Sequence, residues 1–417
     1  MTTTYVYIYL KEGAVPAGRL EMTGEGQEAT ASFRYGQRYL QREDRVAIDP
    51  VQLPLHEVDT VRTYIAPEGF AIFNGIRDAA PDGWGRHLMD RAAGAQILSE
   101  YDYLIATGED RVGALAFGVD LSGPKRITPW SEEKLAGENF DLAAMLKAVQ
   151  ELDNLHDLPL EQRRFLLRGS SLGGARPKAT TTLDHYQWIA KFGRAEDRYP
   201  ICRTEYAIMK LATSVGLKVP PVCLEKILGQ DIYLIRRFDR IPENGDFQRV
   251  PFISGLTIIG AHESESSRQS YTRLAEQLRL YGSNPKEDTR ELWKRMIFNI
   301  LCNNTDDHLR NHGFLWDGKG WRLSPAYDIV PIPQIGLERD LAIGVGKYGR
   351  QATLMNALSD AASFGLSPDE AAHMAFTIQQ KVKAEWPSFF KESGFQEVEI
   401  ERLQSCFIAC HEIVKRD

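Results

Sequence analysis

The sequence has few cysteines, and their arrangement excludes two classes of protein. There are five, none of them in a CxxC pair: Cys202, Cys223, Cys302, Cys406 and Cys410. An odd, scattered set argues against a disulfide scaffold and against a structural zinc site. It is typical of a chain kept in a reducing compartment, so we expect a cytoplasmic protein.

Long apolar runs and a basic excess are also missing. No stretch of 18 apolar residues occurs, so we expect no membrane-spanning helix and no membrane partner. Residues 1–5 lack the basic and apolar regions of a signal peptide. The net charge of −7 argues against a protein that coats nucleic acid by itself, although it does not exclude a local basic face. At 417 residues, 43% hydrophobic and 26% charged, the chain fits a globular protein of two or three domains.

A dense polar cluster follows an apolar, helical segment at residues 292–302. Asp306 and Asn311 are five residues apart, and Asp328 comes 17 residues after Asn311. Protein kinases use this spacing: an Asp faces the hydroxyl, an Asn five residues later holds Mg²⁺, and a later Asp bridges metal and phosphates. Hard oxygen ligands of this kind suit Mg²⁺. The alternative is an Asx-rich turn, with Asp306 or Asp307 as a cap.

A glycine-rich stretch at residues 168–178 is a candidate phosphate loop. Its three glycines let successive backbone N–H groups approach an anion. Walker A spacing is absent, and a flexible turn is the alternative. Residues 185–192 alternate as a strand, with Lys191 on the polar face, where kinases place a phosphate-binding lysine. Glu205, in the helix predicted at 203–212, pairs with Lys191 in that interpretation, or else simply favours the helix dipole.

Residues 222–235 predict a hairpin followed by a charged segment. In a kinase-like fold this segment is the hinge, with Arg236 and Phe238 near adenine and Asp239 near ribose; a charged loop after a strand is the alternative. Strands are also predicted at 5–10, 18–20, 29–35 and 110–118. The periodicity predicts helices at 84–91, 142–155, 271–281, 292–302, 368–386 and 398–414.

Taken together, these motifs resemble the HipA family of serine/threonine kinase toxins from bacterial toxin–antitoxin modules. The similarity covers nearly the whole chain, because residues 73–75 and 110–117 look like the family's accessory domain. The kinase motifs follow in the family's order: Ser171–Lys178, Ile189–Phe192, Arg237–Arg240, Asn304–Asn311 and Ser324–Asp328.

The resemblance implies an α+β fold in three parts. A small N-terminal α+β subdomain would occupy residues 1–125, ahead of a bilobal protein-kinase-like fold. Residues 126–240 would form the lobe with the glycine-rich loop, the lysine strand and the hinge. Residues 241–417 would form a mostly helical C-terminal lobe that carries the catalytic and metal-binding motifs.

The resemblance also implies roles for single residues. Asp306 would be the catalytic base, with His308 and Arg310 orienting the catalytic loop or meeting phosphate, while Asn311 and Asp328 would bind Mg²⁺. Ser171, or Ser170 as a second candidate, would be autophosphorylated, which silences the kinase because the added charge lies beside the ATP site. The expected ATP contacts are Ser171, Leu172, Gly173, Gly174, Ala175, Arg176, Lys178, Lys191, Arg236, Phe238 and Asp239.

The implied partners are a protein substrate, an aminoacyl-tRNA synthetase, and a helix-turn-helix antitoxin similar to HipB. Contact with operator DNA is expected only through the complex with that antitoxin. Two departures from the family pattern, Arg236 in place of an acidic residue and Arg176-Pro177 in place of Gln-Glu, leave side-chain recognition of adenine and of the target open.

Two other functions are compatible with the motifs. One is a small-molecule phosphotransferase, and the other is an inactive corepressor acting with a DNA-binding antitoxin. The corepressor has no physical need for the full set Lys191, Asp306, Asn311 and Asp328, which favours an enzyme. A metal hydrolase fits poorly, because the HExxH pattern is missing.

Overall fold

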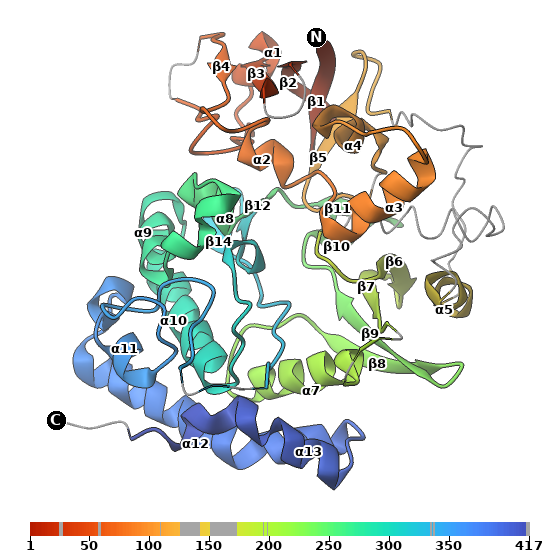
Figure 1. Cartoon of the computed structure of the whole chain (residues 1–417). Helices are drawn as coiled ribbons and strands as arrows, with labels where there is room; N and C mark the ends of the chain where they lie inside the picture. Colours follow the sequence, from red (N-terminus) through yellow and green to blue (C-terminus); the bar gives the residue numbers. More distant parts are fainter. Residues whose placement is uncertain are drawn as a thin grey trace. The chain divides into compact units, whose positions relative to one another are not determined.

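The chain forms two compact units (Figure 1), unit 1 from Met1–Asp197 and Glu225–Ile253 and unit 2 from Arg198–Leu224 and Ser254–Asp417. The structure is a computed structural model that describes residues 1–24, 28–56, 60–108, 110–125, 142–150, 173–194, 196–197, 199–333, 336 and 338–413. Unit 1 is built on β-sheets and unit 2 is mainly helical, which confirms the predicted α+β class. The three-part division of the chain stays a prediction.

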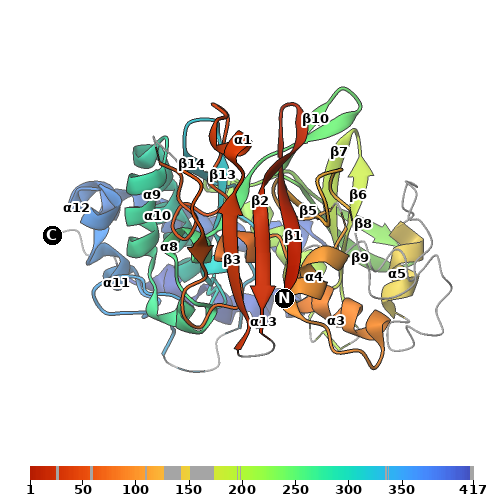
Figure 2. The same cartoon turned by 90° about the horizontal axis from the view of Figure 1, so that it is seen from above.

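An antiparallel five-stranded sheet opens unit 1, in the order β4-β3-β2-β1-β5, with β1 to β3 side by side in Figure 2. The apolar residues Val6, Tyr7 and Ile8 are buried, as expected for a strand paired on both sides. The strand predicted at 110–118 begins only at Leu115. The bounds are β1 Thr2–Leu10, β2 Gly13–Thr23, β3 Thr30–Tyr35, β4 Tyr64–Ile65 and β5 Leu115–Gly118.

Short helices complete this part of unit 1. A Cβ atom on Gly75 would lie 2.3 Å from the Ile48 carbonyl oxygen, so only glycine fits this close approach. The Gly75 N–H donates to the buried Asp49, 3.0 Å away. The helices are α1 Gln37–Leu40, α2 Asn74–Arg77, α3 Gly83–Ala93, α4 Glu100–Ala106 and α5 Leu142–Gln150; the predicted continuation of α5 to 155 lies outside the described residues.

The second sheet of unit 1 has the order β6-β7-β9-β8, and it carries the lysine strand. The predicted alternation on β7 is confirmed, because Trp188, Ala190 and Phe192 are buried while Lys191 is partly exposed. The chain returns from unit 2 within β8. The strands of this sheet are β6 Lys178–Leu183, β7 Tyr186–Phe192, β8 Val222–Ile227 and β9 Gln230–Arg236. Three strands outside this sheet follow in the chain: β10 Arg240–Glu243, β11 Asp246–Arg249 and β12 Phe252–Ser254.

Unit 2 packs α7, α9, α10 and α12 around a buried aromatic and aliphatic core. None of its described helices, nor any in the described part of unit 1, combines the length and apolarity needed to cross a membrane. The elements are α7 Ile201–Ser214, α8 Gly255–Ile259, η3 Glu263–Arg268, α9 Tyr271–Tyr281, α10 Pro285–Leu301, η4 Leu309–Asn311, β13 Gly313–Trp316, β14 Trp321–Leu323, α11 Leu354–Leu358, η5 Ala361–Phe364, α12 Pro368–Glu392, α13 Glu397–Leu403 and η6 Gln404–His411.

Two helices of unit 2 differ from their predicted bounds. Helix α10 begins at Pro285, seven residues before the predicted start, because proline suits the first helical turn and the polar residues that follow also lie in the helix. The single helix predicted at 398–414 is instead α13 followed by the 3-10 helix η6, with non-helical backbone at Phe407. The Phe407 ring stacks on Trp386 with centroids 4.2 Å apart, so tertiary packing accompanies this break.

A buried ion cluster joins the N-terminal part of unit 1 to the segment after β9. The Asp239 carboxylate accepts hydrogen bonds from Arg237, from Arg240 at 2.9 Å and from the Gly113 N–H at 2.8 Å. Both guanidinium groups also donate to the Arg111 carbonyl. The predicted hinge motif therefore fixes the loop at 110–113 by contacts within one unit.

The electrostatics of this cluster follow from its burial. Burial alone would raise the pKa of Asp239, but the two neighbouring guanidinium groups hold that pKa well below its ordinary value. Burial, together with the charge of Arg237, lowers the pKa of Arg240 to about 9. The cluster is thus stable only as a complete set, because any one charge would otherwise be buried without compensation.

We expect Asp239→Asn to lower the free energy of unfolding by about 3–5 kcal/mol, because it leaves two buried guanidinium groups without their carboxylate. Chemical denaturation measures the change. Asp246→Asn, at the exposed end of β11, is the matched control and should change stability by no more than about 0.5 kcal/mol. Equal effects of the two variants would contradict a structural role for the cluster.

Candidate active site

The candidate catalytic loop begins where α10 ends. Asn303 takes the left-handed backbone conformation, with φ of 52°, which asparagine tolerates better than most residues and which stops the helix. The Asn304 N–H then donates to the Asn299 carbonyl at 2.9 Å. The Asn304 amide also donates to the Asn299 side chain at 3.1 Å. The polar cluster is therefore tied back onto the last turns of a buried helix.

Two adjacent aspartates of this loop have opposite environments. The Asp306 side chain is exposed, whereas Asp307 is 3% exposed. Asp307 Oδ2 accepts hydrogen bonds from the Tyr271 hydroxyl, from Asn299 Nδ2 at 2.8 Å and from His312 Nε2 at 3.0 Å. A carboxylate with this set of donors holds the loop in place, and it leaves Asp306 as the carboxylate available for chemistry.

The pKa values of the two carboxyl groups move in opposite directions. Burial by itself would raise the pKa of Asp307, but the charge of His312 and the hydrogen bonds from His312 and Tyr271 hold it below its ordinary value. The pKa of Asp306 is raised, first by partial burial and then by the charges of Asp328 and Asp307, against a lowering by His308. Asp328 is therefore close enough to Asp306 to act on its charge.

The predicted metal ligands lie beside Asp306. Asn311 Nδ2 donates to the Asp306 carbonyl at 3.1 Å, which leaves the amide oxygen available as a ligand. Asp328 takes the left-handed conformation, with φ of 59°. The Tyr327 hydroxyl donates to the Arg310 carbonyl at 2.7 Å, so the segment before Asp328 is attached to the catalytic loop. The structure thus brings Asp306, Asn311 and Asp328 together within unit 2.

This donor set fits a magnesium ion held with the help of phosphate oxygens. In the described part of the chain, no group of three or more His, Cys, Asp and Glu side chains could hold a metal alone. One carboxylate and one amide oxygen, on Asp328 and Asn311, match a hard cation that takes its other ligands from water and a nucleotide. The mutual repulsion of Asp306 and Asp328 gives a cation a favourable electrostatic position.

The two remaining predicted catalytic residues border the loop. Arg310 forms an ion pair with Glu263 of η3, with Nε 3.2 Å from Oε1. The His308 main chain is part of the loop turn, because its N–H donates to the Asp306 carbonyl at 2.8 Å. Their proposed contacts with phosphate stay predictions.

The anchoring residues Tyr271, Asn299, Asp307 and His312 carry no motif that sequence reasoning could use alone. The sequence offers one clue to the buried network, which is that Asp306 and Asp307 are adjacent. Only one of two successive carboxylates is expected to face the nucleophile, so the other needs partners inside the protein. Tyr271 lies 36 residues from Asp307 in the chain, and only folding brings it there. The network contains three side chains that each contact the Asp307 carboxylate, so it is a support for the candidate base.

The described part of the glycine-rich loop lies in unit 1, where its carbonyl groups accept hydrogen bonds from neighbouring residues. The Trp84 N–H at the start of α3 donates to the Gly174 carbonyl at 2.9 Å. Gly174 has φ of 99°, a backbone conformation that favours glycine. Arg194 donates to the Ala175 carbonyl at 2.7 Å. Ser170, Ser171 and Leu172 lie outside the described residues.

Two lysines meet at the base of this loop. The register of β6 and β7 places Lys178 directly opposite Lys191, and facing like charges destabilise a sheet. Lys178 Nζ donates to the Gly173 carbonyl at 2.5 Å, and Lys191 Nζ lies 5.8 Å from the centroid of the Tyr233 ring. A cation pair retained beside a glycine-rich loop indicates a place for an anion such as phosphate.

The other predicted nucleotide contacts already have protein partners. Arg176 forms an ion pair with Asp197 at 2.7 Å, and the Arg236 guanidinium lies 4.4 Å from the centroid of the Tyr186 ring. Phe238 packs near Phe252, with ring centroids 6.4 Å apart. Asp239 belongs to the buried ion cluster. The ATP contacts of these residues, and the pairing of Lys191 with the buried Glu205, stay predictions.

Comparison with known families identifies two domains. The model of the HipA N-terminal domain matches residues 6–118, and the model of the HipA-like C-terminal domain matches residues 170–386, more than half of the chain. The first match covers the five-stranded sheet. The second extends from the glycine-rich loop through both candidate catalytic motifs into α12.

Individual proteins show the same relationship. The chain is 26% identical over 332 residues to "Putative kinase Y4mE" of Sinorhizobium fredii, covering 76% of each protein. It is 28% identical over 366 residues to "Putative kinase Y4dM" of the same organism, covering 84% of this chain and 81% of that protein. Among solved structures, HipA from the HipA, HipB and operator DNA complex of the Shewanella oneidensis MR-1 toxin–antitoxin system aligns with a TM-score of 0.69 at 17% identity, over 98% of this chain and 96% of that one. That likeness shows a shared fold.

We expect Asp307→Asn to lower the free energy of unfolding by about 3 kcal/mol at neutral pH, because it weakens a buried hydrogen-bonded ion pair. The folded-state pKa of Asp307 is below its unfolded value, so the contribution is fully present above the unfolded value near 3.9. It is lost as the pH falls through the folded value. The difference from wild type should therefore be constant near neutral pH and shrink as the pH falls below the unfolded pKa of about 3.9.

Denaturation curves at several pH values measure this difference. The adjacent Asp306→Asn is the matched control, since it makes the same chemical change on an exposed side chain, and it should leave stability within about 0.5 kcal/mol of wild type. A difference for Asp307→Asn that does not vary with pH would rule out the charged pair as its cause.

Proposed function

Because the chain belongs to the HipA family, we propose that it is an ATP- and Mg²⁺-dependent serine/threonine protein kinase, the toxin of a toxin–antitoxin pair. The observation that carries the proposal is the meeting of Asp306, Asn311 and Asp328 in unit 2, with only Asp306 exposed. Relatives that bear the name of kinases support the class of reaction.

In the proposed reaction, a serine or threonine hydroxyl attacks the γ-phosphorus of ATP and ADP leaves. The Asp306 carboxylate accepts the hydroxyl proton, a role that its exposure and its raised pKa favour. Magnesium, held by Asn311 and Asp328, would neutralise charge on the phosphates. Asp307 takes no part in proton transfer, since its carboxylate is engaged by three donors.

Lys178 and Lys191 provide the proposed phosphate contacts of unit 1. An anion bound between the two facing amines would offset the repulsion between their like charges. The glycine-rich loop would supply N–H groups above the phosphates. The hinge at Arg236–Phe238 would contact adenine chiefly through its backbone.

We further infer partners and regulation from family membership. The proposed substrate is an aminoacyl-tRNA synthetase, whose phosphorylation would stop charging and slow growth. The proposed antitoxin is a HipB-like helix-turn-helix protein, because the structurally similar Shewanella HipA was solved with HipB and operator DNA. Autophosphorylation of Ser171, or of Ser170, would silence the enzyme by adding negative charge beside the nucleotide.

Intact mass and peptide mapping after incubation with Mg·ATP test the reaction. We expect wild type to gain one phosphoryl group on the peptide with Ser170 and Ser171, and Asp306→Asn to gain none, because it lacks the proton acceptor. Transfer that persists in Asp306→Asn would remove Asp306 from its role. Phosphorylation of an added small molecule instead of protein would favour a small-molecule phosphotransferase, and absence of ATP binding would favour a corepressor.

Lys191→Met tests the phosphate-binding assignment in unit 1. We expect nucleotide affinity to fall by about 10- to 100-fold, because a charge-assisted hydrogen bond is lost. Isothermal titration calorimetry with ATP measures it. Lys226→Met, on the exposed edge of β8, is the matched control and should bind as wild type does. Unchanged affinity in Lys191→Met would exclude a phosphate contact by Lys191.

A further inference from the structure

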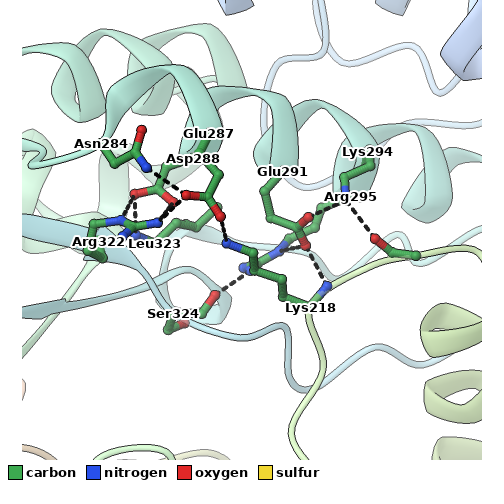
Figure 3. A network of polar contacts seen from close by, with 11 residues as sticks. Lys218, Asn284, Glu287, Asp288, Glu291, Lys294, Arg295, Arg322, Leu323 and Ser324 are labelled. Carbon is green, nitrogen blue, oxygen red and sulfur yellow. Dashed lines mark hydrogen bonds and ion pairs between the residues drawn. The ribbon is translucent and has the colours of Figure 1, made fainter.

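One face of α10 carries a row of buried charged side chains that the proposed chemistry does not use. Asp288, Glu291 and Arg295 are spaced so that they share this face, and each is no more than 2% exposed. Figure 3 shows them directed from the helix toward the segment of Arg322–Ser324 and the loop of Lys218. Burying several charges in one place has a large desolvation cost, so each buried charge should have a partner whose interaction offsets that cost.

The partners of Asp288 and Arg295 lie in the segment that leads to Asp328. Asp288 Oδ2 accepts from the Leu323 N–H at 3.2 Å and from Arg322 Nε at 2.7 Å. The Arg295 guanidinium donates to the Ser324 carbonyl. These contacts fix the chain just before Pro325, only four residues ahead of the candidate metal ligand.

A second line of contacts reaches the same segment through the loop after α7. Glu291 Oε1 accepts from the Lys218 N–H at 2.8 Å, and the Lys218 carbonyl accepts from the Ala326 N–H at 2.7 Å. Arg295 Nε lies 3.7 Å from Glu291 Oε1, so the two side chains form one unit of opposite charge. The segment is thus held from both sides, at Ser324 by Arg295 and at Ala326 through Lys218.

Asp328 needs such support because its backbone is strained. With φ of 59° it occupies the left-handed region, which a non-glycine residue keeps only when its surroundings fix it. Downstream, the Ile332 N–H donates to the Asn303 carbonyl at 3.1 Å, and Asn303 Nδ2 donates back to the Ile332 carbonyl at 2.6 Å. Upstream, the contacts of Asp288, Arg295 and Lys218 are the corresponding anchors.

Burying the charged guanidinium of Arg295 costs free energy, which indicates a function beyond packing. Burial lowers the pKa of its guanidinium, although Glu291, Asp307, Tyr327 and Asp288 favour the charged form. Within the described residues, its Nε and Nη1 atoms have no hydrogen-bond acceptor. An apolar residue of similar length would avoid this cost, so the retained charge is explained by what it holds.

We propose that Arg295, paired with Glu291, is a positioning residue for the candidate metal ligand Asp328. Arg295 holds the Ser324 carbonyl, Glu291 holds Lys218, and Lys218 holds the Ala326 N–H, so that the exit of α7 and the metal-binding segment move together. The inference depends on the proposed kinase function in one respect, which is the assignment of Asp328 as a metal ligand. The anchoring itself is a property of unit 2.

Two measurements on Arg295→Met test the proposal. The first is amide hydrogen exchange of the 322–330 peptide in the protein without ligand, which we expect to become faster while the exchange of α12 stays as in wild type. The second is the Mg²⁺ concentration that gives half-maximal autophosphorylation, which should rise by about 10- to 100-fold, as for other residues that orient metal ligands. ATP affinity without Mg²⁺ should be unchanged.

Arg290→Met is the matched control, because it makes the same substitution on α10 at an exposed pair with Glu370, away from the segment. It should behave as wild type in both measurements. Arg295→Lys keeps the positive charge and one donor nitrogen, and its Mg²⁺ requirement should lie between those of wild type and Arg295→Met. If Arg295→Met does not fold, the lysine variant gives the same test with a smaller expected change.

The outcomes separate this proposal from the proposed function. Unchanged exchange of the 322–330 peptide would overturn the positioning role, whether or not the protein is a kinase. Faster exchange with an unchanged Mg²⁺ requirement would also overturn it, since Arg295 would then be merely structural. If wild type transfers no phosphate, the kinase assignment fails, and with it the metal role of the segment, while the exchange data still report whether Arg295 anchors it.

Discussion

The candidate site of unit 2 depends on the buried carboxylate of Asp307. Three donors from three parts of the chain, Tyr271, Asn299 and His312, converge on one of its oxygens. Asp307 is thereby fixed at the start of the loop, and the preceding residue, Asp306, has to face outward. A catalytic carboxylate acts efficiently only when its position is fixed. Here the buried Asp307 fixes the position of its neighbour, the candidate base Asp306.

In each unit, a cluster of polar groups fixes the segment that carries the predicted site residues. In unit 1 the Arg237, Asp239 and Arg240 cluster joins the loop at 110–113 to the predicted hinge. In unit 2 the Asp307 network holds the catalytic loop. Such clusters contribute less net stability than apolar residues of the same volume, but they accept only one geometry. Positions that chemistry requires to be exact within a fraction of an ångström favour that choice.

The sequence predicts those features of the site that depend on residue spacing along the chain. The separations between Asp306, Asn311 and Asp328, and the alternation around Lys191, are local patterns, and the structure brings these three oxygen-bearing residues together and gives β7 the predicted faces. The structure adds partners that lie far away in sequence. Neither Tyr271 for Asp307 nor Gly113 for Asp239 has a local signature, since each contact exists only after the chain has folded.

Errors in the predicted elements have the same origin. The charged start of α10 shows no apolar periodicity because its inward face carries Asp288 and Glu291 instead of aliphatic residues. A pattern that counts only apolar residues therefore begins the helix at Leu292. Asp288 and Glu291, which interrupt the apolar pattern in the first two turns, also hold the segment before Asp328, so the hydrophobic pattern fails where the helix has a structural task other than apolar packing.

Helix α10 accordingly supports both candidate motifs of unit 2. Its residues 288–295 hold the segment before Asp328 through Asp288, Glu291 and Arg295, and its last turn holds the candidate catalytic loop through Asn299. A helix of 17 residues is about 25 Å long and bends little. Because one rigid element carries both sets of anchors, the candidate base and the candidate metal ligand keep a fixed relation to each other. A change on the buried face of α10 that loosens either segment should therefore also disturb the position of that segment's candidate residue relative to the other.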